Sequence, residues 1–211
     1  MPSLGRLHLI TDTRPGRDPL AVVRAALSAA RAELVVQVRV EDSATDREAY
    51  DLARRVLTLC TSYGASCLVN DRLHVALAVG AAGGHVGADD LPVAAARRVL
   101  GPTGVLGATA RAPGTAGEAV AAGASYLGVG PCHTTSTKTG LPDPIGPAGV
   151  RAVVDAVDAV DVPVIAIGGV TAARVPALRA AGAYGVAVVG AVSAAADPAL
   201  ATAELIEALT C

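Results

Sequence analysis

Residues 19–70 read PLAVVRAALSAARAELVVQVRVEDSATDREAYDLARRVLTLCTSYGASCLVN and contain two helix-to-strand units in succession. In residues 19–33 and 47–64, apolar side chains recur at i, i+3, i+4 and i+7, which predicts two amphipathic helices. Short apolar runs rich in strand-forming residues follow each helix, at 34–40 and 66–70. Strict alternation of strand and helix requires parallel strands joined by right-handed crossovers.

The same alternation continues along the whole chain. We predict eight strands, at residues 6–11, 34–40, 66–70, 84–87, 104–108, 125–128, 162–167 and 185–189. Eight units of roughly 25 residues each favour a closed (β/α)8 TIM barrel, and a doubly wound open sheet is the alternative. Because no linker or low-complexity tract divides residues 1–211, we expect a single barrel domain.

Composition excludes several classes of protein. Although 52% of the 211 residues are hydrophobic, no apolar run reaches the roughly 18 residues of a membrane span. The N-terminus lacks the long apolar region of a secretory signal, so we expect a cytoplasmic protein. A formal net charge of −2, with four Tyr and no Trp or Phe, disfavours nucleic-acid binding and leaves small molecules as the expected partners.

The cysteines and the lysine carry different signals. Cys60, Cys67, Cys132 and Cys211 lack metal-site spacing, which favours reduced and mostly buried thiols. Lys138 is the only lysine among 17 Lys and Arg residues. Arg replaces Lys readily on a solvated surface, but less well where a compact ammonium must reach a phosphate, so Lys138 is a candidate site residue. Chance survival of a single lysine is the alternative.

Polar clusters follow the third and fourth predicted strands, at the barrel edge where chemistry is expected. Asn70 and Asp71 end one strand, and His85 precedes the pair Asp89 and Asp90 after the next. Each cluster also suits the start of a helix, where Asn or Asp caps free backbone N–H groups. Alternatively, Asp71 and Asp90 converge on one Mg²⁺ ion, which is usually held by one or two carboxylates and phosphate oxygens.

Later loops suit phosphate groups. Residues 128–140 combine glycines, five hydroxyl side chains and the sole lysine, a composition typical of a segment that wraps a phosphate or diphosphate. A solvated Thr-rich loop is the alternative. The seventh and eighth predicted strands end in Gly168-Gly169 and Val189-Gly190. Backbone N–H groups at these two positions form the usual phosphate site of such barrels.

The second predicted strand alternates with period two. Gln37, Arg39 and Glu41 therefore share one face, and the intervening valines take the other. In a barrel the polar face must point inward near the mouth, because the outer face is covered by helices. A buried Arg39–Glu41 pair is the structural alternative.

These motifs together resemble the thiamine phosphate synthase family, in order and across nearly the whole chain. The resemblance rests on LHLITD (7–12), Q-x-R (37–39), VNDR (69–72), H-x-G-x-DD (85–90), VGP (129–131) with T-x-TK (135–138), AIGG (166–169) and GVAVV (185–189). It implies a transferase that couples 4-amino-5-hydroxymethyl-2-methylpyrimidine diphosphate with 4-methyl-5-(2-phosphoethyl)thiazole, or its carboxylated form. The expected products are thiamine phosphate and diphosphate.

The resemblance also implies roles for individual residues. Asp71 and Asp90 match the Mg²⁺ ligands, while Arg39, Asn70 and Lys138 match the diphosphate contacts on which catalysis depends. Gln37 and His85 would face the pyrimidine. The remaining matches lie around the phosphates: Thr109, Thr135 and Thr137 near the thiazole phosphate or diphosphate, and Gly169, Val189 and Gly190 around the thiazole phosphate.

Three positions depart from the family pattern. Glu41 stands where the family usually has Lys, Arg111 where it often has His, and Gly190 where Ser is common. Two other functions therefore remain: a thiazole tautomerase-like paralogue, and a non-catalytic binder of thiazole or thiamine phosphate. The sequence leaves open whether the chain forms a homo-oligomer, because apolar residues on the outer helices serve barrel packing equally well.

Overall fold

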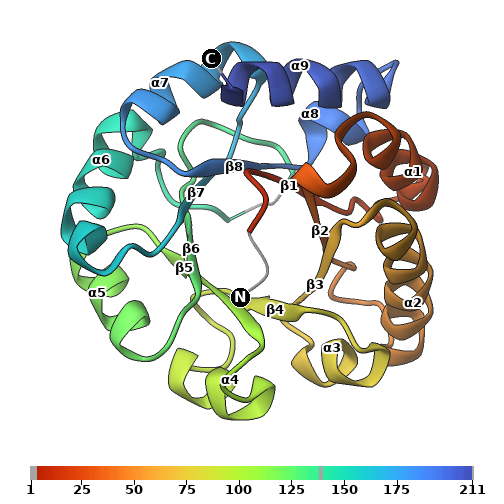
Figure 1. Ribbon diagram of the computed structural model, residues 1–211, viewed down its shortest axis with the longest axis horizontal. Coiled ribbons are helices and arrows are strands. Elements are labelled where there is room, and N and C mark those ends of the chain that lie inside the picture. Colours follow the sequence, from red (N-terminus) through yellow and green to blue (C-terminus); the bar gives the residue numbers. More distant parts are fainter. Residues whose placement is uncertain (1–3, 138–139, 211) are drawn as a thin grey trace.

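Eight parallel strands pair in sequence order, and β8 pairs with β1 to close the barrel. The computed structural model describes residues 4–137 and 140–210. Figure 1 shows the strands at the centre of a ring of helices. The arrangement confirms the predicted (β/α)8 TIM barrel, and the open-sheet alternative is wrong. The strands are β1 (Leu7–Ile10), β2 (Leu34–Val38), β3 (Ser66–Asn70), β4 (Gly83–Val86), β5 (Val105–Ala110), β6 (Tyr126–Val129), β7 (Val164–Ile167) and β8 (Gly185–Val188).

Side-chain caps fix the start of the first two helices. Asp18 accepts hydrogen bonds from the backbone N–H groups of Leu20 and Ala21, and Thr45 and Glu48 form a capping box. The last helix packs against the first and closes the ring. The helices are α1 (Pro19–Ala30), α2 (Asp46–Tyr63), α3 (Leu73–Val79), α4 (Val93–Leu100), α5 (Pro113–Ala121), α6 (Gly146–Val157), α7 (Val175–Ala180), α8 (Gly190–Ser193) and α9 (Pro198–Thr210).

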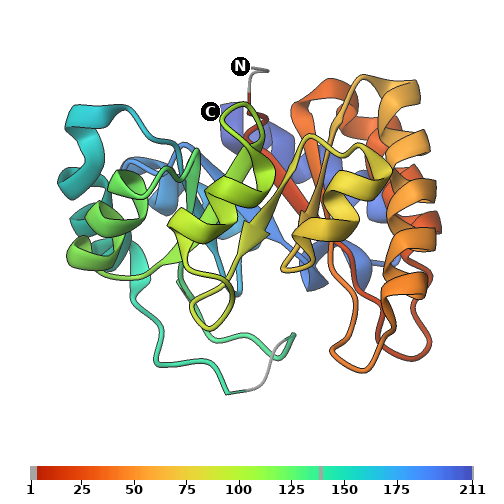
Figure 2. The same ribbon diagram turned by 90° about the horizontal axis from the view of Figure 1, so that it is seen from below.

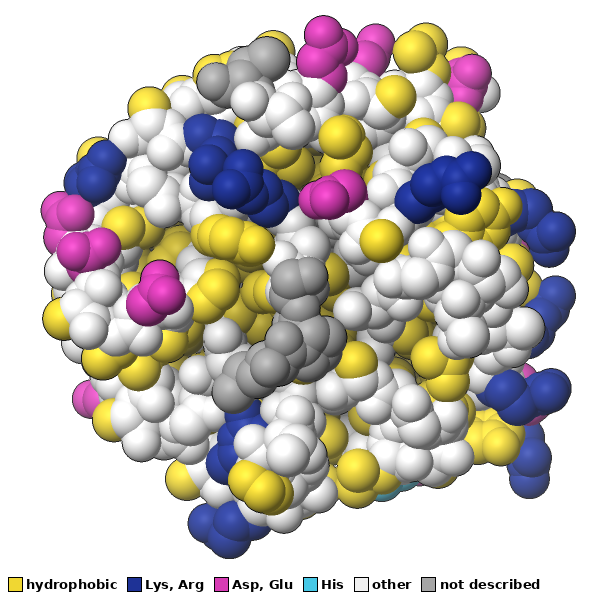
Figure 3. All heavy atoms as spheres, viewed as in Figure 1, with side chains coloured by type: hydrophobic (Ala, Val, Ile, Leu, Met, Phe, Trp, Pro, Cys, Tyr) yellow, Lys and Arg dark blue, Asp and Glu magenta, His cyan; other side chains and the backbone are white. Residues whose placement is uncertain are grey.

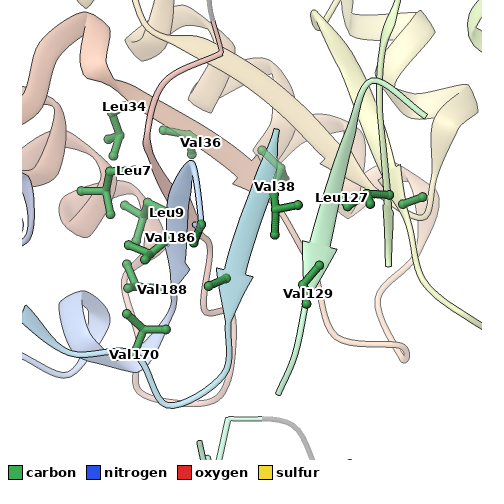
Figure 4. Packing of buried hydrophobic residues seen from close by; sticks show 14 of the residues in the cluster. Leu7, Leu9, Leu34, Val36, Val38, Leu127, Val129, Val170, Val186 and Val188 are labelled. Atoms are coloured by element: carbon green, nitrogen blue, oxygen red, sulfur yellow. The ribbon is translucent and has the colours of Figure 1, made fainter. Parts of the chain in front are cut away.

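The core has two layers because successive side chains of a strand point to opposite faces. Leu7, Leu9, Val36 and Val38 belong to the larger cluster, between the barrel and the helices. Figure 4 shows these residues with their neighbours on β6 and β8. The smaller cluster fills the barrel interior. Its buried members are Ile10, Val35, Leu68, Tyr126, Ile165 and Ala187.

The second strand is shorter than predicted, ending at Val38 instead of Val40. The Thr11 hydroxyl accepts a hydrogen bond from the Arg39 backbone N–H at 2.8 Å and donates one to the Arg39 carbonyl at 2.6 Å. A side chain thus takes both backbone groups that would otherwise continue the ladder with β1. Arg39 and Glu41 consequently lie in the loop above the strand.

The surface carries charges of both signs, and the described cysteines are buried. Figure 3 shows acidic and basic side chains scattered in small groups over one face of the barrel, with apolar groups between them. Cys60, Cys67 and Cys132 are free and buried, as predicted, and Cys211 lies outside the described residues. Within the described chain, no helix is long and apolar enough to span a membrane.

Candidate active site

A cavity of about 900 Å³ opens at the carboxyl ends of the strands. Figure 2 shows that the loops after β1, β2 and β6 extend from the same end of the barrel. All the candidate residues that the structure describes line this cavity, while Lys138 lies outside the described residues. The lining candidates are Gln37, Arg39, Asn70, Asp71, His85, Asp90, Thr109, Thr135, Thr137, Gly169, Val189 and Gly190.

The polar face of β2 points into the barrel, as predicted. Gln37 is buried, and its amide nitrogen donates to the Tyr126 hydroxyl at 3.3 Å. Arg39 lines the cavity, and its guanidinium lies 4.0 Å from the Glu41 carboxylate. Because the Glu41 side chain is 41% exposed, this pair lies at the mouth of the barrel. The predicted alternative of a buried Arg39–Glu41 pair is therefore wrong.

The end of β3 forms a tight turn that presents Asp71. Asp71 has φ +60°, a left-handed conformation uncommon outside glycine. Its backbone N–H donates to the His85 carbonyl at 2.8 Å, which holds this turn against the end of β4. The helix-cap alternative is wrong here, since α3 has Arg72 at its N-cap position without a side-chain capping bond.

Asp90 belongs to the next loop and closes it on itself. Its Oδ2 atom accepts a hydrogen bond from the Gly87 backbone N–H at 2.7 Å. A Cβ atom at Gly87 would lie only 2.8 Å from that oxygen, so glycine allows the approach. The cap of α4 is Pro92, not Asp90. Among the described residues, no three or more His, Cys, Asp or Glu side chains are grouped so that they could hold a metal ion. Asp71 and Asp90 nevertheless both line the cavity from neighbouring loops.

The opposite side of the cavity is built from glycines and hydroxyls. Gly168 and Gly169 have φ +97° and +61° and follow β7. A Cβ atom at Gly169 would lie 2.5 Å from the Thr134 carbonyl oxygen, so this close contact between the two loops requires glycine. Thr135 donates to the Thr137 hydroxyl at 3.2 Å. Arg174, which no sequence motif predicted as a site residue, also lines the cavity and donates to the Gly169 carbonyl at 2.5 Å.

A second group absent from the prediction lies after β1. Asp12 is buried and accepts two 2.8 Å hydrogen bonds from the Arg14 guanidinium. These bonds, with one from Ser193, lower the Asp12 pKa to about 2. Arg17 lies 3.5 Å from the same carboxylate, and both arginines line the cavity. The sequence feature that could have identified this group is the position of residues 12–17 directly after the first predicted strand.

Two aromatic rings form the floor of the cavity. His8 and Tyr126 are buried and meet edge to face, with ring centroids 5.2 Å apart. Burial lowers the His8 pKa to about 3, although a hydrogen bond to the Gly5 backbone opposes the shift. His8 alternates with Leu7 and Leu9 in the sequence, and this period of two is the signal that places its side chain inside the barrel.

Fold and site together define a (β/α)8-barrel protein with a polar cavity at the carboxyl ends of its strands. The family model for thiamine monophosphate synthase matches residues 7–192. The chain therefore belongs to the thiamine monophosphate synthase family, as the sequence motifs indicated.

Full-length relatives and a solved structure agree. The chain is 77% identical to the thiamine-phosphate synthase of Salinispora arenicola over 211 residues, covering 100% of both chains. It is 75% identical to that of Salinispora tropica over 210 residues, again covering 100% of both. The structure of the thiamine phosphate pyrophosphorylase from Pyrococcus furiosus superposes with a TM-score of 0.85 at 34% identity, covering 98% of this chain and 96% of the other.

Proposed function

We propose that this enzyme of the thiamine monophosphate synthase family joins the pyrimidine diphosphate to the thiazole phosphate and releases diphosphate. With the carboxylated form of the thiazole, the carboxyl group leaves in addition as CO2. The observation that carries the proposal is the composition of the cavity. Carboxylates from two neighbouring loops and the Arg39 guanidinium lie at the same rim as a glycine- and hydroxyl-rich wall. This set suits two anionic groups, one of them metal-bound.

In the proposed reaction, the bond between the pyrimidine methylene carbon and the diphosphate oxygen breaks, and its electron pair leaves with the diphosphate. The thiazole ring nitrogen then donates its lone pair to that carbon and forms the new C–N bond. Because negative charge develops on the leaving group, the main catalytic demand is for positive charge and hydrogen-bond donors there. Arg39, Asn70 and Lys138 are the proposed donors.

Asp71 and Asp90 are the proposed ligands of Mg²⁺. The backbone hydrogen bond from Asp71 to His85 supports this assignment, since it holds the two acidic loops together. When bound, the ion would neutralise charge on the diphosphate.

The proposed substrate positions divide the cavity. Gln37 and His85, at the floor, would contact the pyrimidine. Gly169, Val189 and Gly190, with Thr135 and Thr137, would surround the thiazole phosphate. A Cβ atom at Gly190 would lie 3.6 Å from the Thr137 hydroxyl, so these two loops lie together on one side of the site. Thr109, proposed to approach the diphosphate, is exposed within the cavity.

The test is diphosphate release by purified protein given both substrates, with and without Mg²⁺. We expect Mg²⁺-dependent release with formation of thiamine phosphate. Asp71→Asn and Asp90→Asn should each raise the Mg²⁺ concentration needed for half-maximal release, and Asp155→Asn on the outer helix α6 is the matched control. Metal-independent release, or none from well-folded protein, would contradict the proposal.

A Glu41→Lys variant separates the remaining functions. Glu41 places a negative charge beside Arg39, so the variant should bind the diphosphate substrate more tightly. Activity in the variant with none in the wild-type chain would identify a barrel that binds or isomerises the thiazole instead.

A further inference from the structure

Four side chains form a chain of hydrogen bonds across the inside of the barrel. The Gln37 amide nitrogen donates to the Tyr126 hydroxyl at 3.3 Å, and that hydroxyl lies 3.1 Å from His85 Nδ1. His85 Nε2 lies 3.0 Å from the Thr109 hydroxyl. The chain therefore runs from β2 through β6 and β4 to β5, and all four residues line the cavity.

A glycine makes room for the central contact. His85, Gly107 and Tyr126 are register partners on the adjacent strands β4, β5 and β6. An ordinary side chain on β5 would separate the two rings. A Cβ atom at Gly107 would collide with the Tyr126 hydroxyl and with His85 Nδ1. The absent side chain is thus what allows Tyr126 to reach His85 across the intervening strand.

Burial raises the Tyr126 pKa above its usual range, so the phenol keeps its proton and can donate it. A neutral imidazole carries one N–H, which is on either Nδ1 or Nε2. Which nitrogen carries it depends on the partners of the ring.

The hydrogen-bond partners determine which group donates at each step of the hydrogen-bond chain. Since Gln37 donates to the Tyr126 oxygen, the Tyr126 proton is available for His85 Nδ1. Donation from Tyr126 to Nδ1 would place the histidine proton on Nε2, where it would be donated to the Thr109 oxygen. The Thr109 hydroxyl, exposed in the cavity, retains its own proton for a ligand.

We propose that Tyr126 is a positioning residue that holds His85 in its Nε2–H form and thereby makes Thr109 a hydrogen-bond donor toward the pyrimidine diphosphate. The inference rests on the proposed function for the identity of the substrate. Its structural half, the state of the histidine, stands without it. Donation from Thr109 suits an electron-rich acceptor, such as a diphosphate oxygen, and does not suit an N–H group.

The first test needs no substrate. Long-range ¹H–¹⁵N NMR of ¹⁵N-histidine-labelled protein at pH 7 reports which nitrogen carries the proton, and a His85→Gln variant assigns the signal. We expect the Nε2–H form in the wild-type chain and a mixture of the two forms in Tyr126→Phe. A predominant Nδ1–H form in the wild-type chain would overturn the proposal even if Tyr126→Phe did not fold.

The second test is kinetic, with a matched control. Tyr126→Phe keeps the buried ring and removes one hydroxyl, and should raise KM for the pyrimidine diphosphate or lower kcat by roughly five- to tenfold. KM for the thiazole phosphate should not change. Tyr184→Phe also removes one hydroxyl, which donates to the Leu4 carbonyl at 2.8 Å far from the cavity, and should leave both values unchanged.

Variants of Thr109 test the direction of donation along the hydrogen-bond chain. Thr109→Ser keeps the hydroxyl and should lose less activity than Thr109→Val, which should lose as much as Tyr126→Phe. The double variant Tyr126→Phe/Thr109→Val should lose no more than Thr109→Val alone, because both changes remove the same donor. Fully additive losses, or a Tyr126→Phe variant that behaves like Tyr184→Phe, would show that the tyrosine only fills space. An enzyme silent with these substrates but with the expected histidine form would refute the proposed function alone.

Discussion

The Ser193 hydroxyl donates a 2.9 Å hydrogen bond to Oδ2 of Asp12, which joins residues from the two ends of the barrel sequence. Asp12 follows the first strand, and Ser193 ends the short helix after the last. The same carboxylate holds Arg14 through two hydrogen bonds. One buried carboxylate therefore links the segments that follow the first and last strands and contacts two cavity arginines.

We expect Asp12→Asn to lower the free energy of unfolding by about 2 kcal/mol at pH 7. The Asp12 pKa is about 2 in the folded protein, below the ordinary value of 3.8. Its stabilisation is thus fully present above pH 4 and is lost as the pH falls toward 2. Urea unfolding at several pH values measures this. The variant should lose less stability than wild type in that window, whereas Asp89→Asn, at an exposed position, should follow wild type.

His8 makes a different pH prediction. Its pKa is about 3 when folded, against 6.5 ordinarily, so the unfolded chain binds a proton that the folded chain does not. Stability is therefore complete above pH 6.5 and falls as the pH decreases, by about 1.4 kcal/mol per pH unit for each such histidine. His8→Asn should reduce this slope between pH 6 and 4 in denaturant titrations. An unchanged slope would mean that His8 is protonated inside the barrel.

Arg97 joins three segments at the other end of the barrel. Its guanidinium donates to the carbonyls of Gly101, Gly104 and Gly123 and to the Ser125 hydroxyl. A lysine cannot reproduce this fork, so Arg97→Lys should cost about 2 kcal/mol of stability. The neighbouring Arg98 is exposed, and within the described part of the chain its guanidinium donates only to the Ala94 carbonyl, at 3.3 Å. Arg98→Lys is the matched control, and its melting temperature should equal that of the wild-type protein.

The sole lysine provides an activity prediction. Lys138→Ala should lower turnover roughly 100-fold, because it removes a proposed positive contact to the leaving group. Cys132→Ala, six residues earlier, should retain far more activity. Cys132 is buried, donates to the Val129 carbonyl, and has its pKa raised to about 11 by burial, so it remains a thiol. Equal steady-state rates for the two variants would contradict a role for Lys138.

The periodicity of apolar residues and their order along the chain explain which parts of the fold could be predicted from the sequence. The alternation of apolar runs with helical patterns predicted all eight strands to within two residues at either end. The error at β2 arose because the hydroxyl of Thr11, distant in sequence, replaces backbone pairing at Arg39. Likewise, Asn or Asp before a helix predicted caps that α3 and α4 do not use, since a tight turn and a loop-closing bond place Asp71 and Asp90 instead.

The sequence by itself determined the barrel, the edge of it that carries the polar residues, and the family. These three features follow from local periodicity and from motifs at strand ends, and both can be found in the amino-acid sequence alone. Only the tertiary structure decided that Tyr126 meets His85 and that Asp12 meets Ser193. Such contacts depend on which side chain is absent between two strands, as at Gly107, and on closure between the first and last strands, and neither is a property of neighbouring residues.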